Sequence, residues 1–518
     1  MLLHHEFVKI AKTKGQKLAF IDRSTNRRIS YSRALLGAMI LARRIRRYPD
    51  GYIGIMVPNS AGCALSILAT LMAGKIPVMI NYSTGAEQNA RYAQSKCGFK
   101  TIITAHALLN KIECATIDGM VFLENIMREI GLLEKLAALI KTHLPTGALL
   151  RTLREGRAND TIVILFTSGS EQEPKAVELT HCNIGSNVNA ARQVFDFHED
   201  DIVLAVLPLF HVFGLTTNLW LPLILGLTIV TYGNPLEFKT VSRIIVEEKP
   251  TILIATPYFL MGYLKQSAAA EFASLRVVVA GADKTPDWLR AAYEEQHGVC
   301  VFEGYGATET SPVISVNLPG ANRPGSVGKP LPGVQVKIVD INEGQALSRG
   351  EEGKILVKGD LVMKGYLGDI EETVLRIEDG WYETGDMGVL DQEGYLWHRG
   401  RLKRFIKVGG EMVSLVAVEN ILQQILPDDV ESCVVEVPDS KKGASIAVAL
   451  TRDVDQRQTL GALRRRLPAI ALPRHFVVFE ELPKMGSGKI DFRQTAVLVM
   501  ERLKAATPRT RKEMTSDS

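Results

Sequence analysis

Residues 161–181, TIVILFTSGSEQEPKAVELTH, join an apolar run to a polar loop, and this junction indicates the fold class. The run 161–166 is continuously apolar, which is typical of a strand buried on both faces of a parallel sheet. The loop that follows offers hydroxyls and unencumbered backbone N–H groups, and Lys175 adds a positive charge. The loop residues concerned are Thr167, Ser168, Gly169 and Ser170. We predict an anion-binding nest ahead of a helix, with an ordinary turn as the alternative.

Similar apolar runs recur after this loop, separated by helical stretches. They are DIVLAVL from Asp201, LTIVTY from Leu227, TILIA from Thr251, LRVVVA from Leu275 and VCVFE from Val299. Together with the run from Thr161, they predict a doubly wound parallel sheet. The same rhythm occupies residues 52–105, in YIGIMVP, KIPVMINY and KTIITA, and predicts a second sheet.

The texture of the sequence changes twice towards the carboxyl terminus. From about 324 to 400, Gly and Pro become frequent, and short strands such as VQVKIVD and GKILVKG predict a small antiparallel β-barrel or sheet. A new α+β pattern then begins. We therefore expect an α/β protein with a large N-terminal domain, 1–400, a small α+β C-terminal domain, 401–505, and a basic, disordered tail, 506–518.

Composition excludes several classes of protein. The 518 residues carry a formal net charge of only +4, so charge gives no reason to expect nucleic-acid binding. Six scattered cysteines without CxxC spacing predict neither a disulfide framework nor a metal site. The amino terminus does not read as a signal peptide, and the longest apolar run, 219–230, is too short to span a bilayer. We expect a cytoplasmic protein, with peripheral contact at the inner membrane surface as an alternative.

Residues 125–156 have leucines at helical spacing with lysines and arginines between them. We interpret this segment as a helix that packs on the core. A membrane-surface or acyl-delivery helix is the alternative.

Six further motifs follow the loop in order. They are LPLFHVFG (207–214), AGADK (280–284), EGYGATE (303–309), GWYETGD (380–386), GRLKRFIKVGGEMV (400–413) and PKMGSGKID (483–491). In this order and spacing the chain resembles the acyl-adenylate-forming superfamily of acyl-CoA synthetases, luciferases and peptide synthetase adenylation domains. It looks most like the acyl-acyl carrier protein synthetases, including the synthetase half of the bifunctional acyl-ACP synthetase/2-acylglycerophosphoethanolamine acyltransferase. The resemblance covers essentially the whole chain.

The resemblance implies that a fatty acid attacks the α-phosphorus of ATP and that pyrophosphate leaves. The loop 167–175 would hold the β- and γ-phosphates, and Thr308 would contact the α-phosphate. Glu309 would hold Mg²⁺, a cation that requires oxygen ligands. Tyr305 would stack on adenine. The base pocket would also include Gly281, Ala282 and Gly306.

Further roles are implied for single polar residues. Asp386 would accept hydrogen bonds from the ribose hydroxyls, and Arg401 would reach the ribose or the phosphates. Lys489 would bridge the incoming carboxylate and the α-phosphate, where two anions meet. His211 would orient the acid, or would be a satisfied core histidine. Plain turns, core packing and surface charges are the alternatives for the other residues.

The C-terminal domain is implied to be mobile. It would rotate about Lys403 and present a second face, with Lys407, Val408 and Gly409, for thioester formation. The acceptor would be the phosphopantetheine thiol of an acyl carrier protein, with coenzyme A as the alternative. Basic residues of the GRLKRFIK motif would suit an acidic carrier protein.

The phosphate loop departs from the pattern of the superfamily. Ala176 stands where most relatives have glycine, and the usual second glycine is missing from the stretch Glu171, Gln172 and Glu173. Carboxylates beside a triphosphate are unfavourable unless they point to solvent. A binding protein that has lost turnover is therefore the alternative from another class, although we favour an active enzyme.

Overall fold

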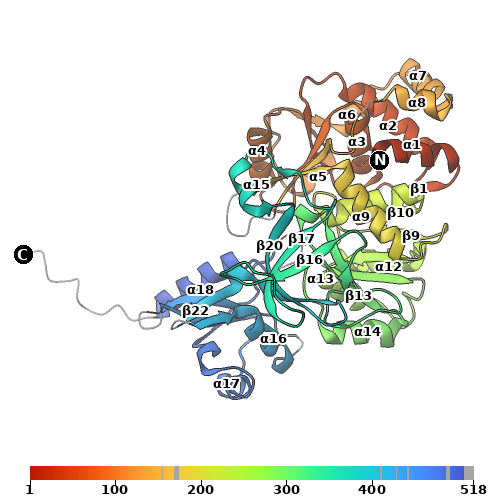
Figure 1. The fold of residues 1–518 in the computed structure, drawn as a ribbon. Helices are drawn as coiled ribbons and strands as arrows, with labels where there is room; N and C mark the ends of the chain where they lie inside the picture. Colours follow the sequence, from red (N-terminus) through yellow and green to blue (C-terminus); the bar gives the residue numbers. More distant parts are fainter. Residues whose placement is uncertain are drawn as a thin grey trace, which may run out of the picture. The chain divides into compact units, whose positions relative to one another are not determined.

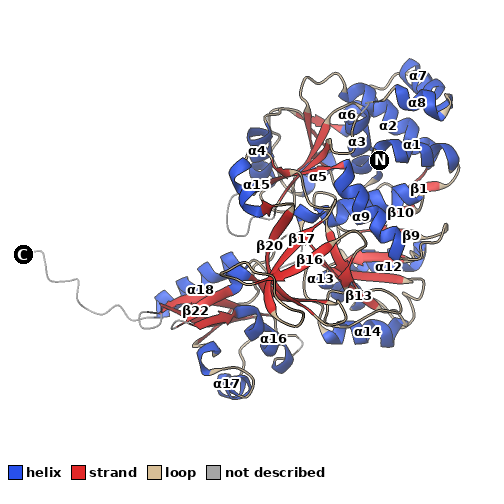
Figure 2. Ribbon diagram, in the orientation of Figure 1, coloured by secondary structure: helices blue, strands red, loops and turns tan. Residues whose placement is uncertain are grey.

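The protein is described here by a computed structural model, which covers residues 1–153, 156–167, 174–408, 411–427, 429–439, 443–485 and 490–506. Its contacts divide the chain into two compact units. The first unit contains nearly all of the chain up to Trp397, and the second contains Gly385–Gly388 and the chain from His398 onward. Figure 1 follows the chain through both units, and Figure 2 distinguishes their helices and strands.

The larger sheet of the first unit has nine strands in the order β15-β14-β13-β12-β11-β9-β10-β1-β2. Their bounds are β1 Leu18–Asp22, β2 Arg27–Ser30, β9 Ile202–Ala205, β10 Thr228–Thr231, β11 Ile252–Ala255, β12 Val277–Gly281, β13 Val301–Gly306, β14 Val313–Val316 and β15 Lys329–Pro330. The strands from β13 to β1 are parallel, and the strands at both edges are antiparallel. All five predicted runs after the loop form strands of this sheet.

The second sheet has seven strands in the order β18-β8-β7-β4-β3-β5-β6. Their bounds are β3 Tyr52–Met56, β4 Ile76–Met79, β5 Ile102–Thr104, β6 Met120–Phe122, β7 Thr161–Phe166, β8 Ala176–Thr180 and β18 Gly365–Tyr366. The run from Thr161 was assigned to the other sheet, and that prediction is wrong, because β7 pairs with β4. The helix expected after residues 166–181 is present as α9, His181–Val194. Residues 176–180 form β8, which returns antiparallel to β7.

Helices connect these strands. Their bounds are α1 Leu3–Thr13, α2 Tyr31–Ile45, α3 Ala61–Met72, α4 Ala86–Cys97, α5 His106–Lys111, α6 Leu123–Arg128, α7 Leu132–His143, α8 Thr146–Arg151, α9 His181–Val194, α10 Val212–Gly214, α11 Leu221–Leu225, α12 Phe238–Glu248, α13 Pro257–Leu264 and α14 Asp287–His297. A typical example is α12, which buries Val241, Ile244 and Ile245 at the three- and four-residue spacing of one helical face. Helix α3 is apolar on most sides and is buried along its length.

A small sheet occupies the predicted barrel region. It contains β16 Gln335–Val339, β17 Glu352–Lys358, β19 Ile377–Glu378, β20 Trp381–Leu390 and β21 Leu396–Arg401, and α15 Ile370–Arg376 precedes β19. Strands β16 and β17 pair antiparallel, as do β19 and β20. Ile355, Val357 and Leu396 lie in its apolar core.

The second unit is built on a three-stranded sheet of β24 Ser432–Asp439, β25 Gly443–Leu450 and β26 His475–Val478. Alternate residues of β24 point to opposite faces, so Val434 packs with Val418 and Leu422 of α16 Leu415–Ile425. Cys433 and Val435 pack instead with Val499 of α18 Phe492–Ala506. The unit also has a hairpin of β22 Phe405–Val408 and β23 Glu411–Ser414, and a helix, α17 Gln456–Arg464. The α+β pattern predicted after Gly400 is thus present.

Within the described residues, no helix is both long and apolar enough to cross a membrane.

Candidate active site

The predicted adenine residues lie on two neighbouring parallel strands. Gly281 ends β12 and pairs with Gly304 of β13, whose last residues are Tyr305 and Gly306. Ligands of open α/β sheets bind outside these carboxyl ends. A Cβ at buried Gly281 would lie 2.8 Å from the Phe213 ring, so a larger side chain there would require that ring to move.

Ala282, the next predicted residue, has a φ of +74°. An L-residue with a side chain rarely adopts this left-handed conformation, and such strain tends to occur at functional sites. Ala282 is exposed at the end of β12, as a residue that contacts a ligand would be.

Thr308 and Glu309 lie in a tight turn after β13. The turn, Thr308–Thr310, is a short 3₁₀ helix that Thr310 closes by accepting a hydrogen bond from the backbone N–H of Ala307, at 3.0 Å. Gly306 is required here, because a Cβ would lie 2.0 Å from the carbonyl oxygen of Pro312. The backbone of this turn therefore fixes the positions from which the side chains of Thr308 and Glu309 extend.

The predicted carboxylate-orienting residue, His211, lies half-buried directly before α10, with its ring 4.6 Å from that of Phe210. The same segment reaches the turn after β13, because Thr216 donates a hydrogen bond of 2.9 Å to the carbonyl of Ser311. The structure thus brings the LPLFHVFG and EGYGATE motifs together.

The two ends of the predicted phosphate loop are joined to each other. The N–H of Thr167 donates to the carbonyl of Lys175 at 3.0 Å, and the N–H of Lys175 donates to the Thr167 hydroxyl at 3.1 Å. Ser168, Gly169 and Ser170 lie outside the described residues, as do Glu171, Gln172 and Glu173.

Ala176, which replaces the usual glycine, is buried in β8 and pairs with Phe166. The substitution therefore falls in a strand.

One tyrosine lies between the predicted phosphate lysine and the predicted metal ligand. The Lys175 ammonium lies 5.1 Å from the centre of the Tyr366 ring, within the range of a cation–π contact. The Tyr366 hydroxyl donates a hydrogen bond of 2.9 Å to Oε1 of Glu309. Strand pairing positions this tyrosine, since Tyr366 of β18 is opposite Val177 of β8.

A carboxylate on α15 holds Lys175 in place. Glu372 forms an ion pair with Lys175 and accepts a hydrogen bond of 2.9 Å from Nε of Arg376, one helical turn away. Burial raises the pKa of Glu372, but hydrogen bonds from Lys175 and Arg376 outweigh it, so the net pKa is lowered. Burial, and then the nearby charge of Glu309, raise the pKa of Tyr366. At neutral pH the tyrosine is therefore a neutral donor and Glu372 a carboxylate.

Sequence reasoning missed both Tyr366 and Glu372. The available signal was the segment MKGYLGDIEET, 363–373, which places a tyrosine and three acids just before the GWYETGD motif.

Glu309 is the residue predicted to bind a metal ion in this region. Among the residues that the structure describes, no group of three or more His, Cys, Asp or Glu side chains is arranged to hold a metal ion. Glu309 fits Mg²⁺ all the same, because that ion commonly takes one or two carboxylates and fills its other positions with phosphate oxygens and water.

The remaining predicted residues belong to the second unit. Oδ1 of Asp386, which is largely buried, lies 3.7 Å from Nε2 of His398 and 3.7 Å from Nε of exposed Arg401. Lys403 is exposed in the short 3₁₀ turn Leu402–Arg404. Lys407 has its backbone in β22, opposite Met412. Gly409 and Lys489 lie outside the described residues.

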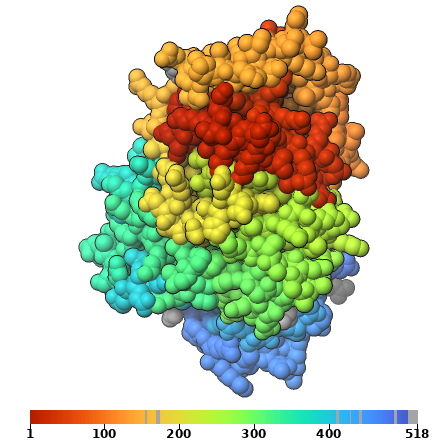
Figure 3. Space-filling model, turned by 90° about the vertical axis from the view of Figure 1, so that its right-hand side faces the viewer, coloured from red at the N-terminus to blue at the C-terminus, as the bar shows by residue number. Residues whose placement is uncertain are grey.

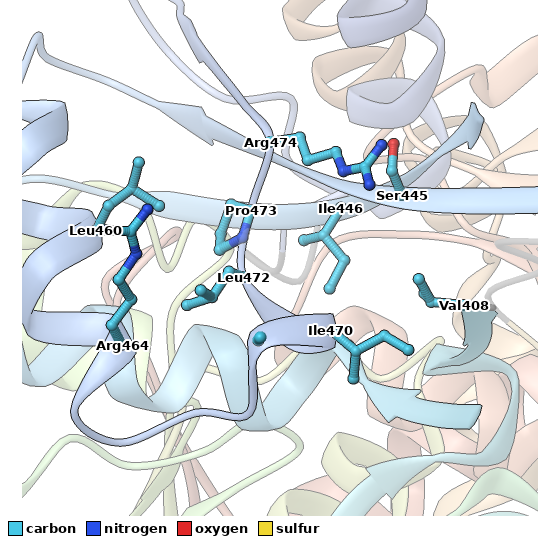
Figure 4. Close-up of a pocket in the computed structure, with 10 residues that line it drawn as sticks. Val408, Ser445, Ile446, Leu460, Arg464, Ile470, Leu472, Pro473 and Arg474 are labelled. Carbon is cyan, nitrogen blue, oxygen red and sulfur yellow. The ribbon is translucent and has the colours of Figure 1, made fainter. Parts of the chain in front are cut away.

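The second unit also has a pocket of about 210 Å³ that sequence analysis did not predict (Figure 4). Its lining includes the apolar residues Ile446, Ile470 and Leu472, and Arg464 and Arg474 add positive charge. Arg474 forms an ion pair with Asp439.

Two family models match the chain. Residues 7–367 match the model of the AMP-binding enzyme family, and residues 417–489 match that of the AMP-binding enzyme C-terminal domain. The chain belongs to the AMP-binding enzyme family. The first matched region contains Thr167, Lys175, Glu309 and Tyr366, and the second ends at Lys489.

Curated relatives cover most of the chain. A long-chain-fatty-acid–CoA ligase of Bacillus subtilis is 31% identical over 85% of this chain and 84% of its own length. A 4-coumarate-CoA ligase of Narcissus pseudonarcissus is 28% identical over 91% of this chain and 88% of its own.

Solved structures share the AMP-binding enzyme fold. ATP-bound MatB from Rhodopseudomonas palustris has a TM-score of 0.83 at 24% identity, over 97% of this chain and all of its own. The O-succinylbenzoate coenzyme A synthetase of Bacillus subtilis, solved with AMP, has a TM-score of 0.80 at 25% identity, over 95% of this chain and 97% of its own. The fold is thus the mixed α/β fold of adenylate-forming enzymes, with a large N-terminal and a smaller C-terminal domain.

Proposed function

We propose that this protein activates a long-chain fatty acid with ATP and transfers the acyl group to the thiol of coenzyme A. The observation that carries the proposal is the arrangement around Tyr366, which joins the ammonium of Lys175 to the carboxylate of Glu309. The negative charge of a triphosphate has to be neutralised, which a lysine cation and a carboxylate that holds Mg²⁺ can do together. Membership of the AMP-binding enzyme family supports the nucleotide, and the fatty-acid ligase of Bacillus subtilis supports the acid.

The reaction has two steps. An oxygen of the fatty acid carboxylate attacks the α-phosphorus of ATP, the bond to the bridging oxygen breaks, and pyrophosphate leaves with its electron pair. The thiolate of the acceptor then attacks the acyl carbon, and AMP leaves. Mg²⁺, when bound, spreads the negative charge of the phosphates.

The protein neutralises and orients the reactants. Lys175 pairs with the β- and γ-phosphates, Glu309 holds the metal ion and Thr308 binds the α-phosphate. Tyr305 and the carboxyl ends of β12 and β13 hold adenine.

The roles in the second unit remain proposals from the resemblance. Asp386 and Arg401 would bind ribose, Lys489 would act in adenylation, and Lys403 would be the hinge of a C-terminal domain that starts near Arg401. Lys407 would serve thioester formation.

The acceptor is proposed from the relatives. Those reported above are named as coenzyme A ligases or synthetases, which favours coenzyme A. Transfer to an acyl carrier protein, predicted from the resemblance to acyl-ACP synthetases, stays a prediction. Peripheral membrane contact is also part of the proposal, because long-chain acids reside in bilayers.

The test separates the two steps. Purified protein with ATP, Mg²⁺ and a panel of fatty acids should release pyrophosphate, and mass spectrometry should detect acyl-CoA when coenzyme A is present. Lys489→Ala should lose adenylate formation yet still convert added acyl-AMP to thioester. No pyrophosphate release with any acid would overturn the proposal. Faster loading of holo-carrier protein than of coenzyme A would restore the original prediction of the acceptor.

A further inference from the structure

Helix α7 turns its apolar side away from the protein. Leu132, Leu133, Leu136, Leu139 and Ile140 are spaced by one, three or four residues, so they share one helical face. Their exposed fractions range from 42% to 81%. Of the residues of α7, all of which the structure describes, Ala138 is the buried one. The interpretation of this segment as a core-packing helix is therefore wrong for α7.

Polar contacts attach α7 to the rest of the first unit. Glu134, on the side opposite the leucines, pairs with Arg44 at 2.6 Å and with Arg47 at 3.2 Å, both on or beside α2. Lys12 of α1 donates to the carbonyl of Thr142 at 2.8 Å. If α7 packed on the protein through its leucines, its apolar face would point inward and Glu134 would point to solvent. The polar anchoring holds the apolar face outward, and Figure 3 shows this orange part of the chain on the surface of the first unit.

Exposed basic residues lie on α7 and at the ends of α6 and α8. Lys135 and Lys141 are exposed on α7; at 100° per residue Lys135 borders the apolar face, and Lys141 lies farther round the helix, towards Glu134. Arg128 at the end of α6 and Arg151 at the end of α8 are also exposed. Met127, the residue before Arg128, is also exposed.

Acidic residues nearby offset only part of this charge. Glu134 is paired with Arg44 and Arg47, and Glu129 is paired with Arg44. Glu124 of α6 is exposed.

We infer that α7 is a docking surface for an anionic lipid bilayer. An apolar stripe beside a polar face that carries basic residues is the pattern of a helix that lies in the membrane interface. At 1.5 Å per residue, α7 presents about 18 Å of such surface. This inference rests on the proposed function in one respect, which is that a long-chain fatty acid is drawn from the bilayer.

A second copy of the chain fits this face less well. A two-fold interface brings the same patch of both subunits together, so the lysines and arginines of one copy would face those of the other. An acidic carrier protein would match the basic residues but would leave the five large apolar side chains without an apolar counterpart. Phosphate headgroups above acyl chains match both features.

Vesicle sedimentation tests the inference. Wild-type protein should bind vesicles of phosphatidylcholine with phosphatidylglycerol and should bind vesicles of phosphatidylcholine alone far less. Leu133→Glu combined with Ile140→Glu should weaken binding by about tenfold or more, because it places charge in the apolar face. Lys135→Glu combined with Lys141→Glu should also weaken it and remove most of its dependence on salt.

A matched control uses exposed apolar residues elsewhere in the first unit. Leu236→Glu combined with Val246→Glu, before and on α12, changes exposed side chains in the same way and should leave vesicle binding unchanged. Pyrophosphate release with a short, water-soluble acid should be the same in all three double variants, which reports that each is folded. Binding measured without substrate separates this inference from the proposed function, because an inactive protein could still bind vesicles.

Three results would overturn the inference. One is equal vesicle binding by the wild type and by the Leu133/Ile140 variant. Another is a wild-type dimer in analytical ultracentrifugation that this variant converts to monomer, which would make α7 a contact between copies. The third is loss of acyl transfer to holo-carrier protein in this variant without any change in vesicle binding.

Discussion

Two parts of the first unit depart from the usual distribution of residues in opposite ways. Around Tyr366, charged side chains lie half-buried and paired with one another. On α7, large apolar side chains lie exposed, while its polar contacts face the protein. Neither arrangement is favourable for stability alone, and such departures concentrate at functional sites. The difference is that the charged groups around Tyr366 are paired with one another, whereas the apolar side chains of α7 need a partner outside the chain to bury them.

Glu309→Gln should have the largest effect on the charged side chains around Tyr366, which we call the polar region. It keeps an acceptor for the Tyr366 hydroxyl but removes the charge proposed to hold Mg²⁺. We expect kcat/KM for adenylate formation to fall by about 10²–10³, the range for losing one key electrostatic group. Pyrophosphate exchange measures it, and chelating Mg²⁺ should abolish wild-type activity.

Glu295→Gln is a suitable control, since Glu295 is an exposed acid on α14. Near-wild-type activity of Glu309→Gln at saturating Mg²⁺ would argue against the metal assignment.

Tyr366→Phe would test whether the tyrosine positions Glu309. It removes a hydrogen bond to a charged group, worth roughly 1.5 kcal/mol, or about tenfold, and retains the ring beside Lys175. We expect the KM for ATP to rise by about that factor with little change in melting temperature. Tyr366→Leu, which also removes the ring, should have a larger effect. An unchanged KM in both variants would make Tyr366 a structural residue only.

Glu372→Gln would show how the polar region depends on pH. The pKa of Glu372 is below its ordinary value in the folded protein, so its contribution to stability is present above the unfolded pKa of about 4.5 and is lost as pH falls through the folded pKa. The variant should therefore be less stable than the wild type at pH 7, and the difference in melting temperature should shrink as pH falls below about 4.5. A difference independent of pH would mean that the Lys175–Glu372 pair does not stabilise the fold.

Arg44→Ala should have the smallest effect on the protein as a whole. It acts on α7 and not on the polar region around Tyr366. It removes a charged partner of Glu134 and loosens α7 locally. Hydrogen exchange should speed up at the amides of α7 but not at those of α12, which is held by Val241, Ile244 and Ile245. Added salt should loosen α7 of the wild type in the same direction. Equal exchange rates in wild type and variant would show that other contacts hold α7.

Strands were the most predictable part of the fold. Apolar runs such as those of β9 to β13 form strands because they can be buried on both faces. The sequence of an apolar run does not predict which sheet it joins. For that reason Thr161–Phe166 was assigned to the wrong sheet. The helical period of 125–156 was also visible, but it is the same whether the apolar face points to a core or to solvent.

The site was predictable where one motif carries several residues. Tyr305, Gly306, Thr308 and Glu309 lie within one turn of chain, so the sequence keeps them together. Tyr366 lies 57 residues from Glu309, and Glu372 lies 197 from Lys175. Contacts over such separations arise from strand pairing, which no local pattern reports.

The pairing of Tyr366 with Val177 makes chain length matter as much as residue identity. Successive side chains of a strand point to opposite faces, so inserting or deleting one residue just before Tyr366 would turn its ring away from Lys175 and Glu309. Substitutions on the solvent side of this segment can accumulate during evolution without that effect. We therefore expect homologues that keep the chemistry to differ in residue identity in this segment but not in its length. We expect engineered insertions to be tolerated in the loops farther along the chain.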